Sequence, residues 1–461
     1  MDAATAEAPD RNAPRFVTGS TLRHVAVMTA TSSVGLIAIF AVDFLSLLYI
    51  SWLGDPRLTA GVGLATIVLF LATSANVGLM IAISALVSRA LGARERDKAR
   101  RLAGSCFAHT IVAAVLISAI ILLLLPWLLP KLGASSETMP VAQRFLWITL
   151  PSNFLMAAGM GFSAVLRGVG DAKRAMYVTL SGGIVTAALD PILIFGFGLG
   201  TDGAAIATVV SRIIFAYAAF RGAVHVHRLV GRPSLAEVIA DTRPMYGIAL
   251  PAMLTNVATP VAGAFFAATI AQFGDQAIAA NAVVDRLVPV AFGGLFALSG
   301  AVGPILGQNW GAGHFDRMRG ALRDSVMFAA VYVGAIWLGL IILRQPLTSL
   351  FNVTGSAAEI LEFFCLISGP VWFFNGLLFV ANASFNNLGF PLLSTAFNWG
   401  RATLGIIPFA VLGARWAGPQ GAFAGVGIGS LIFGLAAVAV AFWTIGRLER
   451  NGRSRRAAAS I

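Results

Sequence analysis

Two aspartates stand inside long apolar runs, where a carboxylate needs a chemical reason. Asp43 lies in LIAIFAVDFLSLLYI and Asp190 lies in TAALDPILIFGFGLG. An aspartate near the middle of a membrane span costs about 2.5–3.5 kcal/mol on insertion scales, so such residues usually face a cavity and carry ions, protons or substrate. Burial and a neighbouring carboxylate both favour the protonated form, so the pair is expected to bind a proton or a sodium ion. The structural alternative is that Asp190 caps a broken helix or bonds a neighbouring hydroxyl.

Three residues near Asp190 could support that chemistry. Pro191 removes one backbone hydrogen bond and can free the carbonyl of Ala187, which supplies a ligand or a hinge beside the carboxylate. Thr186 lies one turn before Asp190, and Thr208 lies in the next apolar run. Both threonines could join a hydrogen-bond network, although threonines that bond their own helix carbonyls are commoner.

Arg401 is a basic residue inside an apolar run of the C-terminal half. An arginine at membrane depth also requires a reason. It either lines a cavity of the C-terminal half or forms an ion pair with a carboxylate such as Asp285 or Glu362. The ion pair is the favoured expectation.

No constellation of residues in the sequence fits an enzyme. There is no P-loop, no HExxH and no cluster of cysteine and histidine. The stretch GFGLGTDG has no strand before it, and Cys106 and Cys365 are expected to be buried small hydrophobic residues. We therefore expect no catalytic residues, no cofactor and no structural metal. If the chain moves a solute across the membrane, the energy must come from an ion gradient or from the transported solute itself.

The elements that hold these residues are membrane spans. Hydrophobic residues make up 58% of the 461 residues and charged residues 11%, and the mean hydropathy is +0.84. Soluble domains are roughly half apolar and a quarter charged, so this chain is an all-α polytopic membrane protein. The net charge of +12 and the pI of 10.9 reflect basic loops between spans rather than binding to nucleic acid.

Apolar runs and their punctuation predict twelve transmembrane helices. Their ranges are 22–52, 58–89, 102–127, 141–167, 173–198, 203–223, 244–272, 277–308, 320–343, 357–387, 391–412 and 420–446. Basic residues concentrate in alternate loops, such as SRALGARERDKARR after the second span, and in the C-terminal tail. Since positive charge stays inside, we expect a multi-pass inner (plasma) membrane protein with both termini cytoplasmic and the first span retained.

An internal repeat divides the chain into two halves. Gly92 aligns with Gly311 (311 − 92 = 219), and Gly170 aligns with Gly389 (389 − 170 = 219). A nearly constant offset through six spans predicts two six-helix bundles in the same orientation. The expected organisation is an N-terminal lobe (1–223), a cytoplasmic linker loop (224–243), a C-terminal lobe (244–446) and a basic cytoplasmic tail (447–461). Duplicated bundles of this kind are typical of transporters whose halves rock around a central cavity.

The repeat shows that the carboxylates are not duplicated. Asp43 aligns with Gly263, and Asp190 aligns with Ile407. A carboxylate needed only to build the bundle should occur in both halves, whereas one needed for coupling can belong to one half. At about 1.5 Å per residue, the two lie roughly 16 and 12 Å below the outer helix ends, which indicates a similar depth.

Several stretches resemble the multidrug and toxic compound extrusion (MATE) family. They are VDFLSLLYISWLGDPRLTAGVGLA, LVSRALGARERDKA, AVLRGVGDAKRAM, ALDPILIFGFGLGTDGAAIAT and GPILGQNWGAGHFDRMRGA. The resemblance implies a V-shaped pair of lobes that exports amphipathic, often cationic, organic compounds in exchange for protons or sodium. It also implies a small-molecule substrate and a lipid environment as partners, and we expect a monomer.

Within this family, Asp43 and Asp190 resemble the acidic residues of the DinF-like branch. The NorM-like branch has acidic residues in the seventh and tenth spans, and the seventh span here has none, which argues against that branch. Family members often have asparagine where this chain has Thr186, whose hydroxyl is a weaker cation ligand, so the resemblance favours protons, with sodium bound at Asp43 and Asp190 as the alternative. A flippase for a lipid-linked precursor, as in the same superfamily, remains an alternative function, and a non-transporting scaffold leaves the unduplicated carboxylates unexplained.

Overall fold

The computed structural model describes residues 14–459, with side chains described as far as Gly452. The described chain is all-helical. The N-terminal half contains α1 (Thr21–Ser51), α2 (Pro56–Gly92), α3 (Arg96–Lys131), α4 (Thr138–Thr149), α5 (Asn153–Val169), α6 (Ala172–Pro191) and α7 (Gly200–Phe220). The C-terminal half contains α8 (Leu235–Ala271), α9 (Asp275–Gly311), α10 (Phe315–Leu350), α11 (Ser356–Asn387), α12 (Pro391–Gly400) and α13 (Ile407–Ala459).

The described helices account for the twelve predicted spans. Eleven helical stretches are long and apolar enough to cross a membrane, and the fourth of them joins α4 to α5. The last stretch, Pro391–Gly452, is broken by non-helical residues at Ala417 (φ −140°) and Gly418 (φ 61°), so it contains two spans. Positive φ at Gly418 is a conformation that costs glycine little.

Helix ends extend beyond several predicted ranges because polar caps continue a helix past the apolar run. The range 224–243 was predicted as a loop, but α8 already begins at Leu235. A capping box starts it: the Ser234 hydroxyl accepts from the backbone N–H of Glu237, whose carboxylate accepts from the N–H of Ser234. At the other end, α13 runs through most of the predicted tail, to Ala459.

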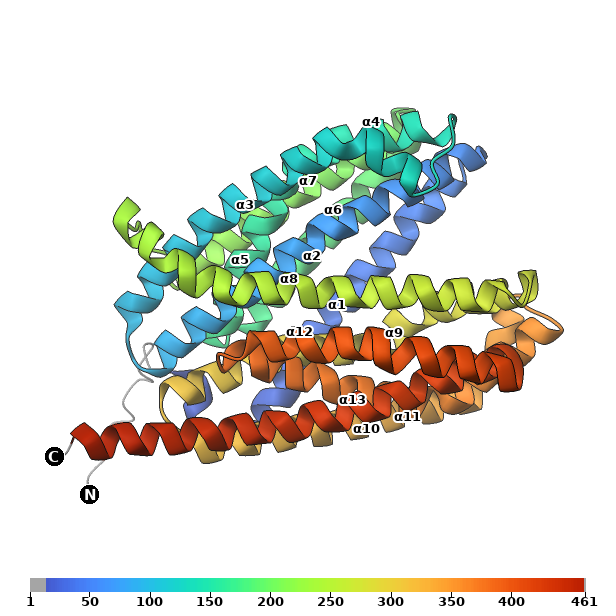
Figure 1. Ribbon diagram of the computed structural model, residues 1–461. Helices are drawn as coiled ribbons and strands as arrows, with labels where there is room; N and C mark the ends of the chain where they lie inside the picture. Colours follow the sequence, from blue (N-terminus) through green and yellow to red (C-terminus); the bar gives the residue numbers. More distant parts are fainter. Residues whose placement is uncertain (1–13, 460–461) are drawn as a thin grey trace, which may run out of the picture.

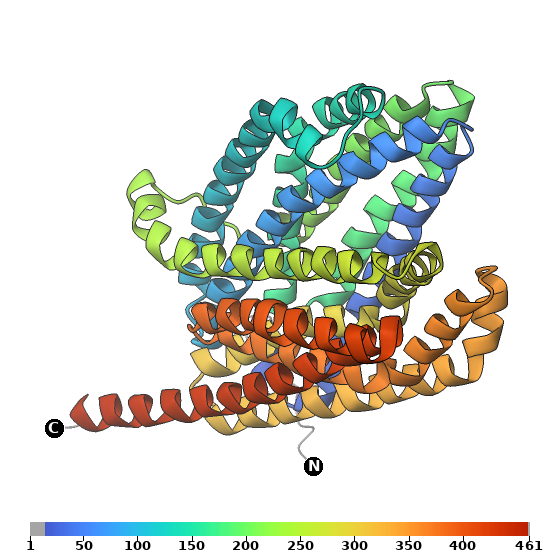
Figure 2. The same cartoon turned by 45° about the vertical axis from the view of Figure 1, so that its right-hand side comes forward.

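The two halves form two lobes that meet at one end and diverge at the other (Figure 1). The first and last described residues lie at the end where the lobes meet, which we call the closed end. Figure 2 shows the same divergence from a second direction. The first helix of each half packs against both halves. Helix α1 contacts α6 of its own half and α9 and α10 of the other, and α8 contacts α12 of its own half and α2 and α3 of the other.

The hydrophobic cores follow this exchange of helices. A core of the C-terminal lobe includes Val25 and Met28 of α1, both at most 2% exposed. A core of the N-terminal lobe includes Met245 and Ala249 of α8, both fully buried. Each lobe is therefore completed by one helix of the other half, and α1 is held between α6 and α9.

Candidate functional site

The interface between α1 and α6 positions both aspartates. Gly183 of α6 lies against Val42 of α1, where an added Cβ would be 3.5 Å from the valine side chain. One to two turns further along, the Ser46 hydroxyl donates a hydrogen bond to Oδ2 of Asp190. Since residues three apart share a helix face, Asp43 lies about 4.5 Å along the axis from Ser46, on the side of α1 that approaches Asp190.

The two carboxylates differ in exposure. Asp190 is 1% exposed, and its Oδ1 has no hydrogen-bond partner among the described residues. Asp43 lies at the surface of the helices rather than between them, and the two groups are close enough to interact electrostatically. Buried polar atoms are nearly always paired, so the unpaired carboxylate oxygen of Asp190, with a second carboxylate nearby, can accept a proton or a cation.

Pro191 lies where α6 ends. The five residues that follow, Ile192–Gly196, form a π-helical turn rather than a continued α-helix. Single π-turns are rare and often occur at functional sites. The backbone beside Asp190 is therefore irregular at the point where the sequence predicted a hinge.

The two threonines do not join a network around Asp190. The hydroxyl of Thr186 donates to the carbonyl of Gly182 at 3.2 Å, and that of Thr208 donates to Ala204 at 3.0 Å. Each is thus bonded within its own helix, which was the commoner alternative. Helical threonines do this because the carbonyl four residues earlier lies within reach of the hydroxyl.

Arg401 lies in the C-terminal lobe, and the expected ion pair is absent. Arg401 is only 7% exposed, and it is the first residue of a π-helical turn, Arg401–Ile406. No ion pair joins it to Asp285 or Glu362; Asp285 instead accepts a hydrogen bond from Asn281 at 3.0 Å. The prediction of an ion pair was wrong because sequence alone does not give the distance between helices.

Other polar residues of the N-terminal lobe were missed by the sequence analysis. Ser46 is the most important, and its spacing of three residues from Asp43 was the available signal. Asn76 of α2 and Asn153 of α5 form a buried amide–amide hydrogen bond of 2.9 Å. Arg212 of α7 donates to the carbonyl of Thr149 at 2.6 Å, which ties it to the end of α4.

The closed end is held by polar contacts between the lobes and the segment before α1. The side chain of Arg317 donates to the carbonyls of Phe16 and Thr18, at 3.0 and 3.1 Å, while Gln308 accepts from the backbone N–H of Phe16 at 2.9 Å. On the other lobe, Arg15 donates to the carbonyl of Gly170 at 2.9 Å. The segment before α1 therefore bridges both lobes.

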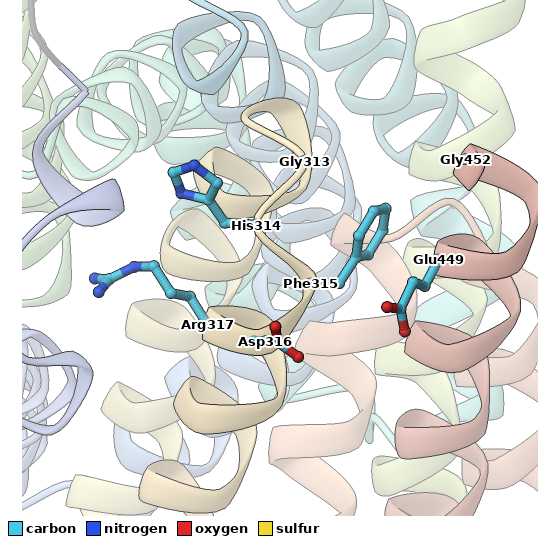
Figure 3. A pocket seen from close by; sticks show the side chains of 7 residues that line it. All are labelled: Gly313, His314, Phe315, Asp316, Arg317, Glu449 and Gly452. Atoms are coloured by element: carbon cyan, nitrogen blue, oxygen red, sulfur yellow. The ribbon is translucent and has the colours of Figure 1, made fainter. Parts of the chain in front are cut away.

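A surface groove at the closed end lies away from the predicted site residues. It is formed by the start of α10 and the last part of α13, and Figure 3 shows Phe315 of α10 beside Glu449 of α13. An ion pair between Arg319 and Glu449 joins these helices nearby. The groove is thus a feature of the closed end and separate from the carboxylates.

Two six-helix lobes that diverge from a closed end, with carboxylates inside one lobe, define a polytopic membrane transporter rather than an enzyme. The MatE family model matches residues 32–192 and 251–412, and the chain belongs to this family. The two matched ranges begin 251 − 32 = 219 residues apart, the same offset as the internal repeat.

Relatives and solved structures agree with this family. The chain is 28% identical over 416 residues to a FAD transporter of Shewanella oneidensis, covering 89% of this chain and 92% of the relative. It is 24% identical to the probable multidrug resistance protein NorM of Thermotoga maritima, covering 72% of each chain. A crystal structure of the Vibrio cholerae MATE transporter VcmN, in a mutant form, superposes with a TM-score of 0.87 at 25% identity, covering 93% of this chain and 98% of that one.

Proposed function

We propose that this protein is a secondary active efflux transporter that exchanges amphipathic organic compounds for protons, with sodium as the alternative coupling ion. The observation that carries the proposal is the pairing of Asp190, buried and with one free oxygen, with Asp43 on the facing helix. Both carboxylates belong to one lobe, so ion binding changes the charge of that lobe alone.

Alternating access supplies the mechanism. In the open V, ions reach Asp43 and then Asp190 from the side where the lobes diverge. Neutralising the two charges removes their repulsion and the cost of keeping a carboxylate in a low-dielectric interior. The irregular backbone after Pro191 then lets the end of α6, which contains Asp190, shift relative to α1, and the solute leaves as the ion binds.

The coupling role predicts the outcome of two substitutions. Asp43→Asn and Asp190→Asn should each abolish gradient-driven export of a fluorescent amphipathic compound from proteoliposomes while leaving expression and folding unchanged. A pH gradient and a sodium gradient are imposed separately, which identifies the ion. Asp285→Asn, a carboxylate of the other lobe, is the matched control and should retain export. Full export by both N-lobe variants would end the proposal.

The substrate class stays broader than the family resemblance alone implies. Exported multidrug substrates are often cationic, but the relative from Shewanella oneidensis is named for FAD, which carries a pyrophosphate. We therefore propose amphipathic organic solutes, including cations. A lipid-linked precursor flippase is less supported because it would need several free basic residues in its cavity, and Arg89 and Arg212 are bonded to backbone carbonyls.

We also propose that the closed end faces the cytoplasm of the inner membrane. The basic loops and the first and last described residues lie at this end, as positive-inside orientation requires. A tag at either terminus should be inaccessible to impermeant reagent in intact cells and accessible after lysis. Labelling of intact cells would reverse the orientation.

A further inference from the structure

We propose that Arg401 anchors a site in the C-terminal lobe that binds an anionic group, a carboxylate or a phosphate, of the transported solute. The inference deepens the proposed function and rests on it, because a transported solute presupposes that the protein is a transporter. It concerns the lobe that contains neither Asp43 nor Asp190, so it is tested independently of ion coupling.

The first step is that Arg401 has no protein partner. Its residue is 7% exposed, its Nε has no hydrogen-bond partner, and no hydrogen bond or ion pair involves its guanidinium among the described residues. Other arginines in the spans are bonded: Arg89 to the carbonyl of Asn387 at 2.7 Å and Arg212 to that of Thr149 at 2.6 Å. A buried charge without a partner is expensive, so Arg401 is retained for something other than stability.

The second step is the direction in which Arg401 points. On α12, Trp399 donates to the carbonyl of Leu254 in α8 at 3.0 Å, so this side faces α8. Phe397 stacks on Phe385 of α11, with ring centroids 5.7 Å apart, so that side faces α11. By helical spacing, Arg401 lies between these two sides, on the buried side of α12, and the turn that it begins packs against α13 and α8.

The third step is that this buried side of α12 is polar. Ser394 and Asn398 precede Arg401 by seven and three residues, share its side of the helix and are at most 3% exposed. From α11, Asn375 and Asn382 lie seven residues apart, and the Oδ1 of each is buried without a partner. Helices α8, α9, α11 and α12 contact one another in a closed ring. The side-chain amides of Asn398 and Asn375 already donate to backbone carbonyls of their own helices, so the free guanidinium supplies the donors that a carboxylate or phosphate requires. The unpaired Oδ1 atoms of Asn375 and Asn382 can accept from a hydroxyl or amine of the same solute.

The repeat shows that this charge, like the aspartates, is not duplicated. The offset of 219 aligns Arg401 with Gly182, and the offset of 217 aligns it with Ile184 (401 − 219 = 182; 401 − 217 = 184). One lobe thus contains the buried Asp190 and the other the buried Arg401, and the repeat duplicates neither. A solute with an anionic group can be held by the C-terminal lobe while the N-terminal lobe exchanges the ion.

The experiment is thermal unfolding of the purified full chain with three matched probes: benzoate, phenyl phosphate and benzyl alcohol. At least one anion should raise the unfolding midpoint of the wild type more than the neutral alcohol, because a ligand that binds the folded state stabilises it. The two anions distinguish a carboxylate site from a phosphate site. Arg401→Gln should weaken anion binding by about tenfold or more, as loss of a charge-assisted hydrogen bond implies, without changing the effect of benzyl alcohol. Arg401→Lys should retain part of the preference.

Arg212→Gln is the matched control. It should lower the midpoint without ligand, because it leaves the carbonyl of Thr149 without this donor, and it should keep the anion preference. Arg401→Gln should unfold at or above the wild-type midpoint. The proposal is overturned if neither anion stabilises the wild type more than benzyl alcohol, if Arg401→Gln keeps the preference, or if it lowers the midpoint as Arg212→Gln does. No gradient is present, so failure of ion coupling in the aspartate variants leaves this result unaffected.

Discussion

Arg89 and Gln308 occupy equivalent positions of the two halves, and each donates a hydrogen bond to the opposite half. The Nε of Arg89 bonds the carbonyl of Asn387, and the Nε2 of Gln308 bonds the carbonyl of Gly168, both at 2.7 Å. The donors are 308 − 89 = 219 residues apart and the acceptors 387 − 168 = 219. Two equivalent hydrogen bonds, related by the internal repeat, therefore join the two halves at the closed end.

Removing both donors should loosen the closed end. In Arg89→Ala/Gln308→Ala, each lobe loses its symmetric bond to the other, so the form that is open at this end becomes more populated. Spin labels at positions 94 and 313 should report a longer distance and a broader distribution than in the parent. Arg96→Ala is the control, because Arg96 bonds the carbonyl of His227 within its own lobe at 2.6 Å. Equal distances in the double variant and this control would contradict the interpretation.

Two glycines allow the helices to meet at the same place. A Cβ added at Gly92 would lie 2.0 Å from the carbonyl oxygen of Gln308, and one added at Gly311 would lie 2.1 Å from that of Arg89. Gly92→Ala and Gly311→Ala should each force α2 and α9 apart and destabilise the protein by about 1–3 kcal/mol, the usual cost of overpacking. Thermal unfolding of the purified protein measures this loss.

The same helices supply the controls for these glycines. Gly63 of α2 and Gly300 of α9 have no atom within 4 Å of an added Cβ. Alanine at either position should be neutral or stabilising by up to about 1 kcal/mol, because alanine is the better helix former. If all four variants behaved alike, the close approach would not explain the glycines.

The sequence predicted the spans and the repeat because both are recorded in local hydropathy and spacing. It also predicted that Asp43 and Asp190 lie at similar depth, and the structure places them on the facing helices α1 and α6. It did not predict helix ends such as Leu235, because a capping box rather than hydropathy determines where that helix begins. Whether Arg401 forms an ion pair depends on distances between helices, which spacing within one helix does not contain.

Asp171 provides a pH test outside the spans. It caps α6 by accepting from the backbone N–H of Arg174, and it also bonds the side chains of Arg174 and His227. Burial raises the pKa of this carboxyl group. The hydrogen bonds from His227 and Arg174 lower the pKa by a larger amount, so the net shift is downward. A lowered folded-state pKa contributes stability that is present above the unfolded pKa of about 4 and is lost as pH falls through the folded pKa.

Two substitutions at Asp171 separate charge from capping. Asp171→Asn keeps a good cap but removes the charge, so it should be less stable than the wild type at pH 7, and the difference should shrink only below about pH 4. Asp171→Ala should lose about 1 kcal/mol more at every pH, because the cap is gone as well. Unfolding midpoints between pH 3 and pH 8 measure both effects. A difference between wild type and Asp171→Asn that does not change with pH would contradict the role of the charge.

Ser46 tests whether the carboxylate pair must be held in place. Its hydroxyl is the described side-chain donor to Asp190, so Ser46→Ala leaves both oxygens of a buried carboxylate without a protein partner. A hydrogen bond to a charged group contributes about 1.5–3 kcal/mol, so pH-driven export from proteoliposomes should fall by about tenfold or more. Ser33→Ala removes a hydroxyl of the same helix that bonds its own backbone at Thr29, and it should export normally. Equal export by the two variants would show that Asp190 works without Ser46, and the α1–α6 contact would then serve packing alone.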